Sequence, residues 1–132
     1  FNNSVYLYGF NHAATFNEEM WGNNMTECWN QTVCHGEELV FVFHPNPGPI
    51  QANYTESETE LAYTIQQYWT QFARNGSPGN AMNNNQNTAW FPFILGSEPS
   101  ISFQTDDVVM VSNVDRDNHK CDFWDSVGYN WL

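Results

Sequence analysis

A histidine and two carboxylates directly before a short apolar run are the residues with the clearest chemical potential. His35, Glu37 and Glu38 precede the apolar stretch 39–43. A histidine at the edge of a buried element can carry a proton near neutral pH, because its ordinary pKa lies close to physiological pH. The same pattern also fits a histidine that only forms a hydrogen bond at the end of a loop. On the local pattern alone, His35 is a candidate general base with both interpretations open.

The composition restricts the classes of partner. The chain has 132 residues, a length typical of one domain, and a net charge of −12 with only three Lys and Arg. This charge repels phosphate backbones and anionic headgroups, so we expect neither nucleic acid nor an acidic membrane as a partner. The acidic surface fits both simple solubility and the binding of cationic ligands. No apolar run approaches the ~20 residues that a membrane span needs.

Two elements can be predicted from their residue patterns. Residues 4–10 are rich in Val, Tyr and Phe, which is typical of a central strand buried on both faces of a parallel sheet. Thr55 and Glu58 have the spacing of a capping box, and Gly76 ends the helical pattern that follows, so we predict a helix over 56–75. The residues that should pack against the sheet are Leu61, Ile65, Tyr68 or Trp69, and Phe72.

The other segments are shorter or less regular. Residues 11–32 show no sustained period and predict a long excursion over the surface. The amide-rich segment 79–89 predicts a mobile or disordered loop. Residues 101–103 and 108–111 are short strand candidates, and residues 118–127 suggest a short terminal helix.

Several motifs, in their order along the chain, resemble type-B carboxylesterases, the family of the cholinesterases. The His-Gly-x-Glu pattern at 35–38, followed by apolar residues, resembles the segment that carries the catalytic histidine of that family. Further matching segments are 6–12, 53–55, 68–78, 90–93 and 121–124. The resemblance covers nearly the whole chain but only the C-terminal part of the family. It implies that 1–132 is the C-terminal segment of a single α/β-hydrolase domain, incomplete on its own. That segment would hold a central strand, the histidine loop, a long helix, short strands and a terminal helix.

Hydrolysis through a serine requires a nucleophile, a base, an acid that orients the base, and an oxyanion hole. The sequence contains neither a Gly-x-Ser-x-Gly elbow nor a Gly-Gly oxyanion segment. The resemblance makes His35 the general base, with the serine and the carboxylate upstream of Phe1. It also suggests that Glu38 acts as a hydrogen-bonding and electrostatic group behind the base, although a carboxylate satisfied in a loop fits equally. We assign no role to Glu37, and we expect no cofactor and no metal.

Two further residue groups have structural and functional interpretations. His12, just past the predicted strand, is expected to form a structural hydrogen bond and to have no catalytic role. Trp21 and Trp29 lie in the excursion that lines part of the active-site gorge in the resembled enzymes, but simple packing also explains them.

The three cysteines are Cys28, Cys34 and Cys121. The resemblance implies a bridge between Cys28 and Cys34 that fixes the loop carrying His35, and two reduced buried thiols are the alternative. It further implies that Cys121 bonds to a cysteine upstream of this chain. Neither a zinc site nor a redox site is indicated, because the sequence has no Cys-x-x-Cys motif.

Five Asn-x-Ser/Thr triplets are candidate glycosylation sites. They begin at Asn2, Asn24, Asn30, Asn53 and Asn75. Asn53 is the best placed because it precedes the predicted helix in a polar turn, and Asn75 is the weakest because it lies at the helix stop. Together with the cysteines, the triplets predict a secreted protein or one in the lumen of the secretory pathway.

The leading functional hypothesis is a secreted carboxylic ester hydrolase of cholinesterase-like type that acts on a small-molecule ester. We expect this chain to be inactive alone and to dock on an N-terminal portion that carries the nucleophilic serine. One alternative is a catalytically silent relative used for adhesion or partner binding. Another is a structural or storage glycoprotein that retains the fold. The residue at the upstream elbow distinguishes the enzyme from the other two.

Overall fold

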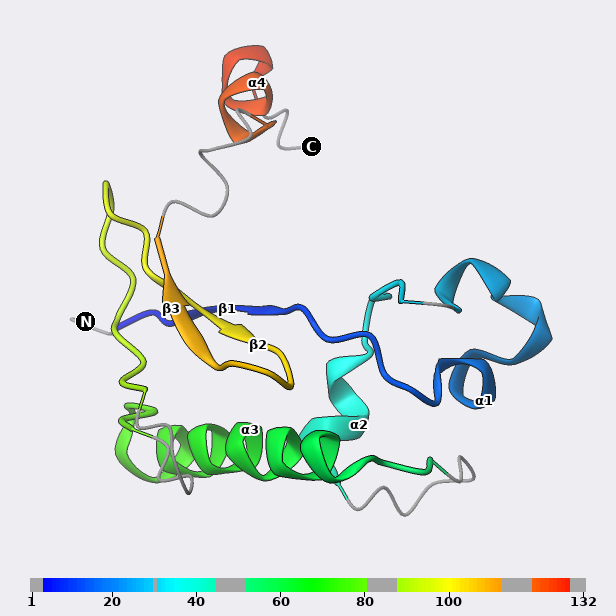
Figure 1. Ribbon diagram of the computed structural model, residues 1–132. Coiled ribbons are helices and arrows are strands. Elements are labelled where there is room, and N and C mark those ends of the chain that lie inside the picture. Colours follow the sequence, from blue (N-terminus) through cyan, green and yellow to red (C-terminus); the bar gives the residue numbers. More distant parts are fainter. Residues whose placement is uncertain (1–3, 30, 45–51, 81–87, 113–119, 129–132) are drawn as a thin grey trace.

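The computed structural model describes residues 4–29, 31–44, 52–80, 88–112 and 120–128. It combines a small sheet with helices of very different length (Figure 1). In chain order the elements are β1 (Leu7–Phe10), α1 (Asn17–Trp21), the 3-10 turns η1 (Gly22–Asn24) and η2 (Thr26–Cys28), α2 (Glu38–Val42), α3 (Glu56–Asn75), β2 (Ser100–Phe103), β3 (Val109–Val111) and α4 (Lys120–Val127).

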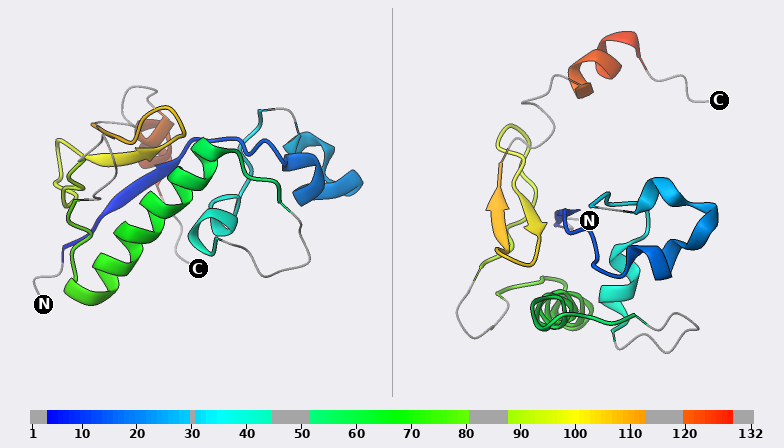
Figure 2. Two further views of the ribbon diagram at one scale, coloured as in Figure 1. Left: turned by 60° about the horizontal axis from the view of Figure 1, so that its bottom comes forward. Right: turned by 45° about the vertical axis from the view of Figure 1, so that its right-hand side comes forward.

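The sheet has the strand order β1-β2-β3, with β1 parallel to β2 and β3 antiparallel to β2. Leu7 pairs with Ser100 and Phe10 with Phe103. A parallel pair needs a long crossover, and the segment that contains α2 and α3 supplies it. In both figures α3 lies along the sheet (Figures 1 and 2). The predicted strands at 101–103 and 108–111 are therefore confirmed, with small shifts at their ends.

The long helix α3 begins and ends where the sequence predicts. The Thr55 side chain accepts a hydrogen bond from the Glu58 backbone N–H, and the Glu58 carboxylate accepts one from the Thr55 backbone N–H, which completes the capping box. Gly76 ends the helix with φ of +70°, a left-handed conformation that glycine adopts without a steric penalty. Local sequence signals alone thus determine both ends of this helix.

The buried face of α3 matches the prediction except at its last turn. Leu61, Ile65 and Tyr68 are almost fully buried, and Trp69 is half-buried. Phe72, predicted on the same face, is 47% exposed. Its ring meets the edge of Tyr6 at 5.8 Å, in a part of the molecule where the described sheet provides no further cover. The expectation that Phe72 is core is therefore wrong for the chain as it stands.

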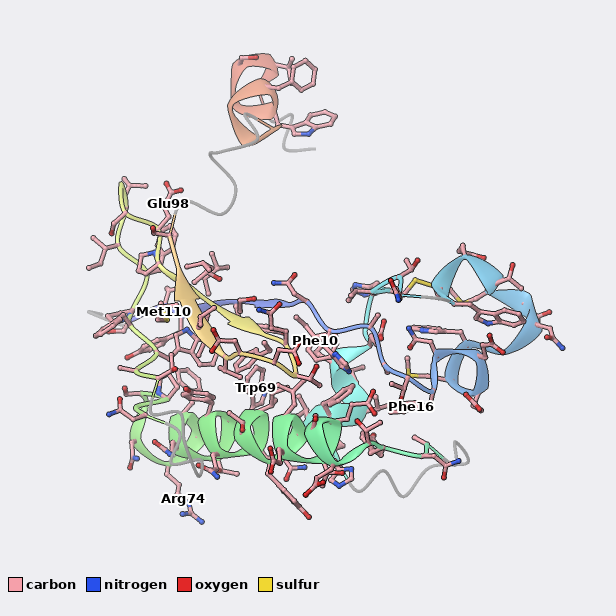
Figure 3. All side chains as sticks on the ribbon, in the orientation of Figure 1. Phe10, Phe16, Trp69, Arg74, Glu98 and Met110 are labelled. Atoms are coloured by element: carbon pink, nitrogen blue, oxygen red, sulfur yellow. A yellow bond between two sulfur atoms is a disulfide. The ribbon has the colours of Figure 1, made fainter. Side chains whose placement is uncertain are left out.

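Trp90 returns the chain to the sheet. Its indole N–H donates to the Leu7 carbonyl at 3.0 Å, and the Phe93 N–H donates to the Val5 carbonyl at 2.7 Å. Its ring lies within 6 Å of the rings of Tyr68, Trp69 and Phe103. Aromatic side chains fill the space between the strands and α3, where Figure 3 shows Phe10 and Trp69. This aromatic layer is the core of the described structure.

The expectation that β1 is buried on both faces is not met. Leu7 and Tyr8 are 37% and 38% exposed, and β1 lies at the edge of the three-stranded sheet. Its burial is incomplete because, within the described residues, a neighbouring strand covers only one of its two edges. The apolar composition of β1 therefore predicted more burial than the described structure shows.

The remaining predictions differ in outcome. The excursion after β1 contains α1 and two 3-10 turns rather than only irregular loop, with Phe16, Asn17 and Cys28 buried. The terminal helix is present as α4, which Figure 1 shows apart from the sheet. Most of the amide-rich loop, residues 81–87, lies outside the described residues. None of the helices in the described parts of the chain has the length and apolarity needed to cross a bilayer.

Candidate active site

His35 occupies the second position of a tight turn. The Glu37 backbone N–H donates to the Cys34 carbonyl at 3.2 Å, which closes the four-residue turn 34–37. Gly36 follows His35 with φ of +84°, the value that the third position of a type II turn requires. A glycine after the histidine is therefore a geometric necessity, and the turn presents His35 at the surface, where it is exposed.

The buried side chain of Glu37 restrains this turn through hydrogen bonds to two backbone N–H groups. Glu37 has no exposed surface, and one carboxylate oxygen accepts the Cys34 N–H at 2.8 Å. The other oxygen accepts the Ala14 N–H, in the segment that leaves β1, at 2.6 Å. A single buried carboxylate therefore joins the turn to the segment that follows the first strand.

A disulfide restrains the first residue of the turn. Cys28 and Cys34 are bonded, with a Cα–Cα distance of 5.6 Å, and Cys28 is 1% exposed. This confirms the expected pairing. The bridge ties the residue directly before His35 to η2, and closure of so small a loop contributes about 2 kcal/mol in the chain-entropy estimate.

The backbone around His35 is restrained, whereas its ring is not. Among the described residues it has no hydrogen-bond or ion-pair partner, and it is exposed. The turn hydrogen bond, the Glu37 carboxylate and the disulfide all act on the backbone around it. An imidazole in this position can exchange a proton with a group presented from outside the described structure.

Glu38 connects the start of α2 to β1. It is the first residue of α2, and its carboxylate accepts the Tyr8 hydroxyl at 3.4 Å. Burial first, and then the charge and hydrogen bond of Glu38, raise the pKa of the Tyr8 phenol. The described contacts of Glu38 are thus with Tyr8, and its role behind His35 stays a prediction.

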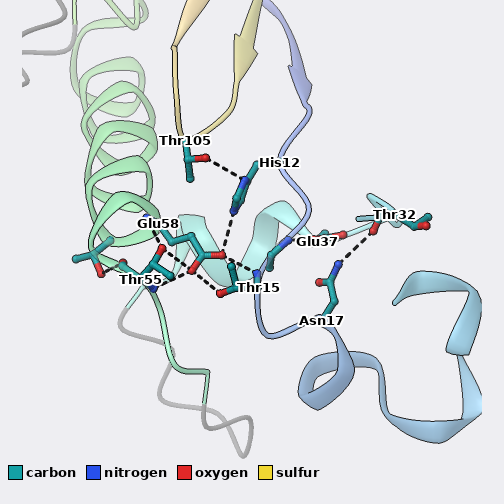
Figure 4. Close-up of polar contacts among 10 residues, drawn as sticks. His12, Thr15, Asn17, Thr32, Glu37, Thr55, Glu58 and Thr105 are labelled. Carbon is teal, nitrogen blue, oxygen red and sulfur yellow. Dashed lines mark hydrogen bonds and ion pairs between the residues drawn. The ribbon is translucent and has the colours of Figure 1, made fainter. Parts of the chain in front are cut away.

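His12 is at the centre of a second polar cluster, in which every member is engaged. Its Nε2 lies 3.0 Å from the Glu58 carboxylate, and its Nδ1 lies 3.4 Å from the Thr105 hydroxyl. Glu58 is fully buried and also accepts the Thr15 N–H at 2.7 Å and the Thr15 hydroxyl at 2.8 Å (Figure 4). Burial alone would raise the pKa of Glu58, but the hydrogen bonds from Thr15, Thr55 and His12 lower it to about 2. The predicted hydrogen bonding of His12 is therefore confirmed.

Glu37 is the residue that sequence reasoning missed. The useful signal is its spacing: Val40 and Phe41, three and four residues later, are both buried. Residues at these spacings share one face of a helical segment, so Glu37 belongs to the buried stripe. A carboxylate on such a stripe must have hydrogen-bond donors, and these donors identify its role.

The other predicted site residues are placed as follows. Trp21 and Trp29 are half-buried, and the Trp29 indole donates to the Gly22 carbonyl at 3.2 Å, which fits packing within the excursion. The candidate glycosylation residues Asn24, Asn53 and Asn75 are exposed. Asn2, Asn30 and the side chain of Cys121 lie outside the described residues. Within the described ranges, no group of His, Cys, Asp and Glu is arranged to hold a metal ion.

An apolar groove of about 410 Å³ opens between β1 and the C-terminal half of α3. Its lining residues are Ser4, Val5, Tyr6, Tyr8, Tyr68, Trp69, Phe72, Pro78 and Trp90. Several of them, including Val5, Tyr8 and Phe72, are the large apolar side chains that stay exposed. The groove therefore runs beside the edge strand and ends at the part of α3 that lacks cover.

Comparison with known proteins agrees with this arrangement. Residues 1–124 match the model of the carboxylesterase family. The chain is 36% identical over 98 residues to the acetylcholinesterase of Bungarus fasciatus, an alignment that covers 74% of this chain and 14% of that protein. It is 28% identical over 128 residues to acetylcholinesterase 1 of Caenorhabditis briggsae (91% and 19%) and 36% identical over 74 residues to Homo sapiens cocaine esterase (56% and 12%). The chain thus spans less than a fifth of the length of these relatives. It belongs to the carboxylesterase family.

Proposed function

We propose that this chain is part of a carboxylic ester hydrolase and that His35 is its general base. The observation that carries the proposal is the combination of a restrained backbone and a free ring at His35. The other described histidines are used differently. The ring of His12 is engaged with Glu58, and the ring of His44 packs against Tyr54 at 4.4 Å, where burial lowers its pKa.

In the proposed reaction, neutral His35 accepts the proton of a serine hydroxyl as that oxygen attacks the ester carbonyl. The resulting imidazolium then gives the proton to the leaving alcohol. The serine, the carboxylate that orients the imidazole and the oxyanion hole would come from a part of the protein outside this chain. The names of the relatives, which are esterases, support a small carboxylic ester as the substrate class.

We further propose that this N-terminal part of the enzyme packs against the open side of β1. The apolar groove and the exposed Val5, Tyr8 and Phe72 provide a surface of the required kind. Within the described residues no strand pairs with the second edge of β1, and this edge can accept another parallel strand. Cys121 in α4 is proposed to form a disulfide with the same part. The Cys28–Cys34 bridge and the exposed Asn24, Asn53 and Asn75 support an extracellular or secretory location.

The central experiment measures hydrolysis of a p-nitrophenyl ester by the intact protein. Replacement of His35 by Ala should reduce kcat by several orders of magnitude, because the base and acid of both half-reactions are lost. His44→Ala is the matched control and should retain turnover. Unchanged turnover in His35→Ala would defeat the assignment of the base.

A fluorophosphonate probe tests whether the intact protein is an enzyme at all. The probe labels a serine only if that residue is activated as a nucleophile. Labelling of one serine outside this chain, strongly slowed by His35→Ala, is the expected result. Absence of any labelling in the folded protein would favour the silent binding or structural relative instead.

A further inference from the structure

We infer that Glu37 is a positioning residue for His35: its buried carboxylate fixes the turn that aims the imidazole. The inference rests on the proposed function, because it gives Glu37 a part in hydrolysis only if His35 is the base. Glu37 does not touch the ring. It acts on the peptide backbone on the N-terminal side of the histidine.

The contacts of Glu37 are confined to backbone N–H groups in its immediate surroundings. Its two oxygens accept from Cys34 at 2.8 Å and from Ala14 at 2.6 Å, and no cation is paired with it among the described residues. Hydrogen bonds from N–H groups to a carboxylate are short and about twice as strong as those between neutral groups. The charge of Glu37 is therefore used to hold two segments of backbone, 20 residues apart in sequence, in one fixed relation.

The two contacts constrain the turn in complementary ways. The bond to Cys34 closes a ring from Glu37 back to the residue before His35, in parallel with the backbone hydrogen bond from Glu37 to Cys34. The bond to Ala14 ties that ring to the segment leaving β1. The disulfide restrains Cys34 relative to η2, whereas the bond from Ala14 to Glu37 restrains the turn relative to the segment that follows β1. Placement of a catalytic group is sensitive to such motion, since a misplacement of about 1 Å can cost roughly 100-fold in rate.

Glu58 is a matched control within the same chain. It is also a fully buried glutamate, and it accepts the N–H of Thr15, the residue next to Ala14. Its other partners are Thr55 and His12, so it joins α3 to the exit of β1 without contacting the turn of His35. Replacing either glutamate by Gln keeps the shape of the side chain and removes its charge.

The test uses the intact enzyme and four variants: Glu37→Gln, Glu58→Gln, His35→Ala and the double variant Glu37→Gln/His35→Ala. An amide oxygen can serve only one of the two N–H groups that Glu37 binds, and its NH2 group opposes the other. We expect Glu37→Gln to lower kcat about 10- to 100-fold with KM changed less than about 2-fold, because orientation and not binding is lost. Glu58→Gln should lower the melting temperature at least as much but leave kcat within about 2-fold of the parent.

The double variant separates positioning from a general loss of structure. If Glu37 acts through His35, its replacement should have no further effect on the residual turnover of His35→Ala. A loss in that background equal to the loss in the parent would overturn the inference, and so would equal losses of kcat in Glu37→Gln and Glu58→Gln. Full turnover in Glu37→Gln would overturn it as well. Should Glu37→Gln not fold, Glu37→Asp, which keeps the charge and shortens the reach, gives the same comparison.

The two proposals fail in different ways. If His35→Ala keeps its turnover, the proposed function is wrong and the inference about Glu37 falls with it. If His35→Ala is inactive while Glu37→Gln keeps the kcat of the parent, only the positioning inference is wrong.

Discussion

Two regions of the molecule each pair a histidine with a buried glutamate, and they use the pair in opposite ways. In the cluster around Glu58, the His12 ring is itself a partner and is engaged at both nitrogens. In the turn closed by Glu37, the carboxylate holds only backbone and the His35 ring stays free among the described residues. The first arrangement uses the imidazole to join elements. The second keeps the imidazole available while it restrains the chain that carries it.

Both carboxylates hold the same short segment. Glu37 accepts the N–H of Ala14 and Glu58 accepts the N–H of Thr15, in the segment that connects β1 to α1. Buried N–H groups need acceptors, and this segment has irregular backbone that cannot supply them from a helix or a strand. The exit of β1 is therefore the point at which the two regions could influence one another. Variants that affect one and spare the other test whether they are independent.

The largest expected contrast is in turnover. His35→Ala should lose about three orders of magnitude or more relative to His12→Ala in the intact enzyme, since only His35 exchanges protons with the substrate in the proposed mechanism. The measurement is kcat for a p-nitrophenyl ester at a temperature where both variants are folded. Comparable losses in the two variants would show that the distinction between an engaged and a free ring has no functional meaning.

The next contrast is in stability. Glu58→Ala leaves the N–H groups of Thr15 and Thr55 without their acceptor and removes the carboxylate half of the capping box, so we expect a loss of about 3 kcal/mol or more in the free energy of unfolding. His35→Ala should cost less than about 0.5 kcal/mol, because its ring is exposed. Urea unfolding of the intact protein gives both values. A larger cost for His35 than for Glu58 would reverse the comparison.

The acid stability of the protein should depend on Glu58. Its pKa in the folded protein, about 2, lies below the ordinary value of 4.5, so the folded state favours the ionised form. This contribution to stability is complete above about pH 4.5 and is lost as the pH falls from there towards 2. Unfolding titrations of the parent and of Glu58→Gln should therefore converge towards pH 2. Parallel curves across this window would contradict the assignment.

Removal of the disulfide should have an effect of intermediate size on stability and turnover. Replacement of both Cys28 and Cys34 by Ser should reduce the free energy of unfolding by about 2 kcal/mol, because the closed loop is short. Turnover should also fall, since one of the restraints on the turn is lost, while the cluster around Glu58 should be unaffected. If the variant loses about 2 kcal/mol of stability but keeps its turnover, Glu37 and the backbone hydrogen bond are sufficient to fix the turn.

The smallest predicted effect concerns Gly36. Its φ of +84° is unfavourable for any residue with a Cβ, although the nearest atom to such a Cβ would be 3.8 Å away. Gly36→Ala should therefore cost about 1 to 2 kcal/mol from backbone strain alone. The change in kcat should exceed the change caused by Gly76→Ala, which has a similar φ at the end of α3 far from His35. Equal effects on kcat would indicate that the turn tolerates strain without moving His35.

Local patterns were sufficient to predict the elements whose ends are marked by local signals. The capping box at Thr55 and the glycine stop at Gly76 specify α3 residue by residue, and the short strands follow from their apolar runs. The disulfide was predicted through the family resemblance. What local patterns could not predict is burial, because it depends on which elements pack against a residue: β1 has the composition of a central strand, yet Leu7, Tyr8 and Phe72 are exposed in the described structure.

The candidate site was predictable only in part, for a related reason. The motif makes His35 a candidate, but the turn that presents it was not predicted, although Gly36 after the histidine is a local signal for it. Of two adjacent glutamates, however, the sequence favoured Glu38 through family likeness, whereas Glu37 is the one that is buried beneath the turn. The choice depends on contacts with Ala14, which a pattern in the segment 33–43 does not contain.

The aromatic layer next to the groove has an optical consequence. The rings of Trp69 and Trp90 lie 5.7 Å apart at 44° to each other, and both border the groove. Two indoles so close and so inclined couple their electronic transitions and give circular dichroism in the ultraviolet that neither would give alone. A segment that enters the groove would alter this signal without any added label. Trp69 and Trp90 therefore form a built-in spectroscopic reporter for occupation of the groove.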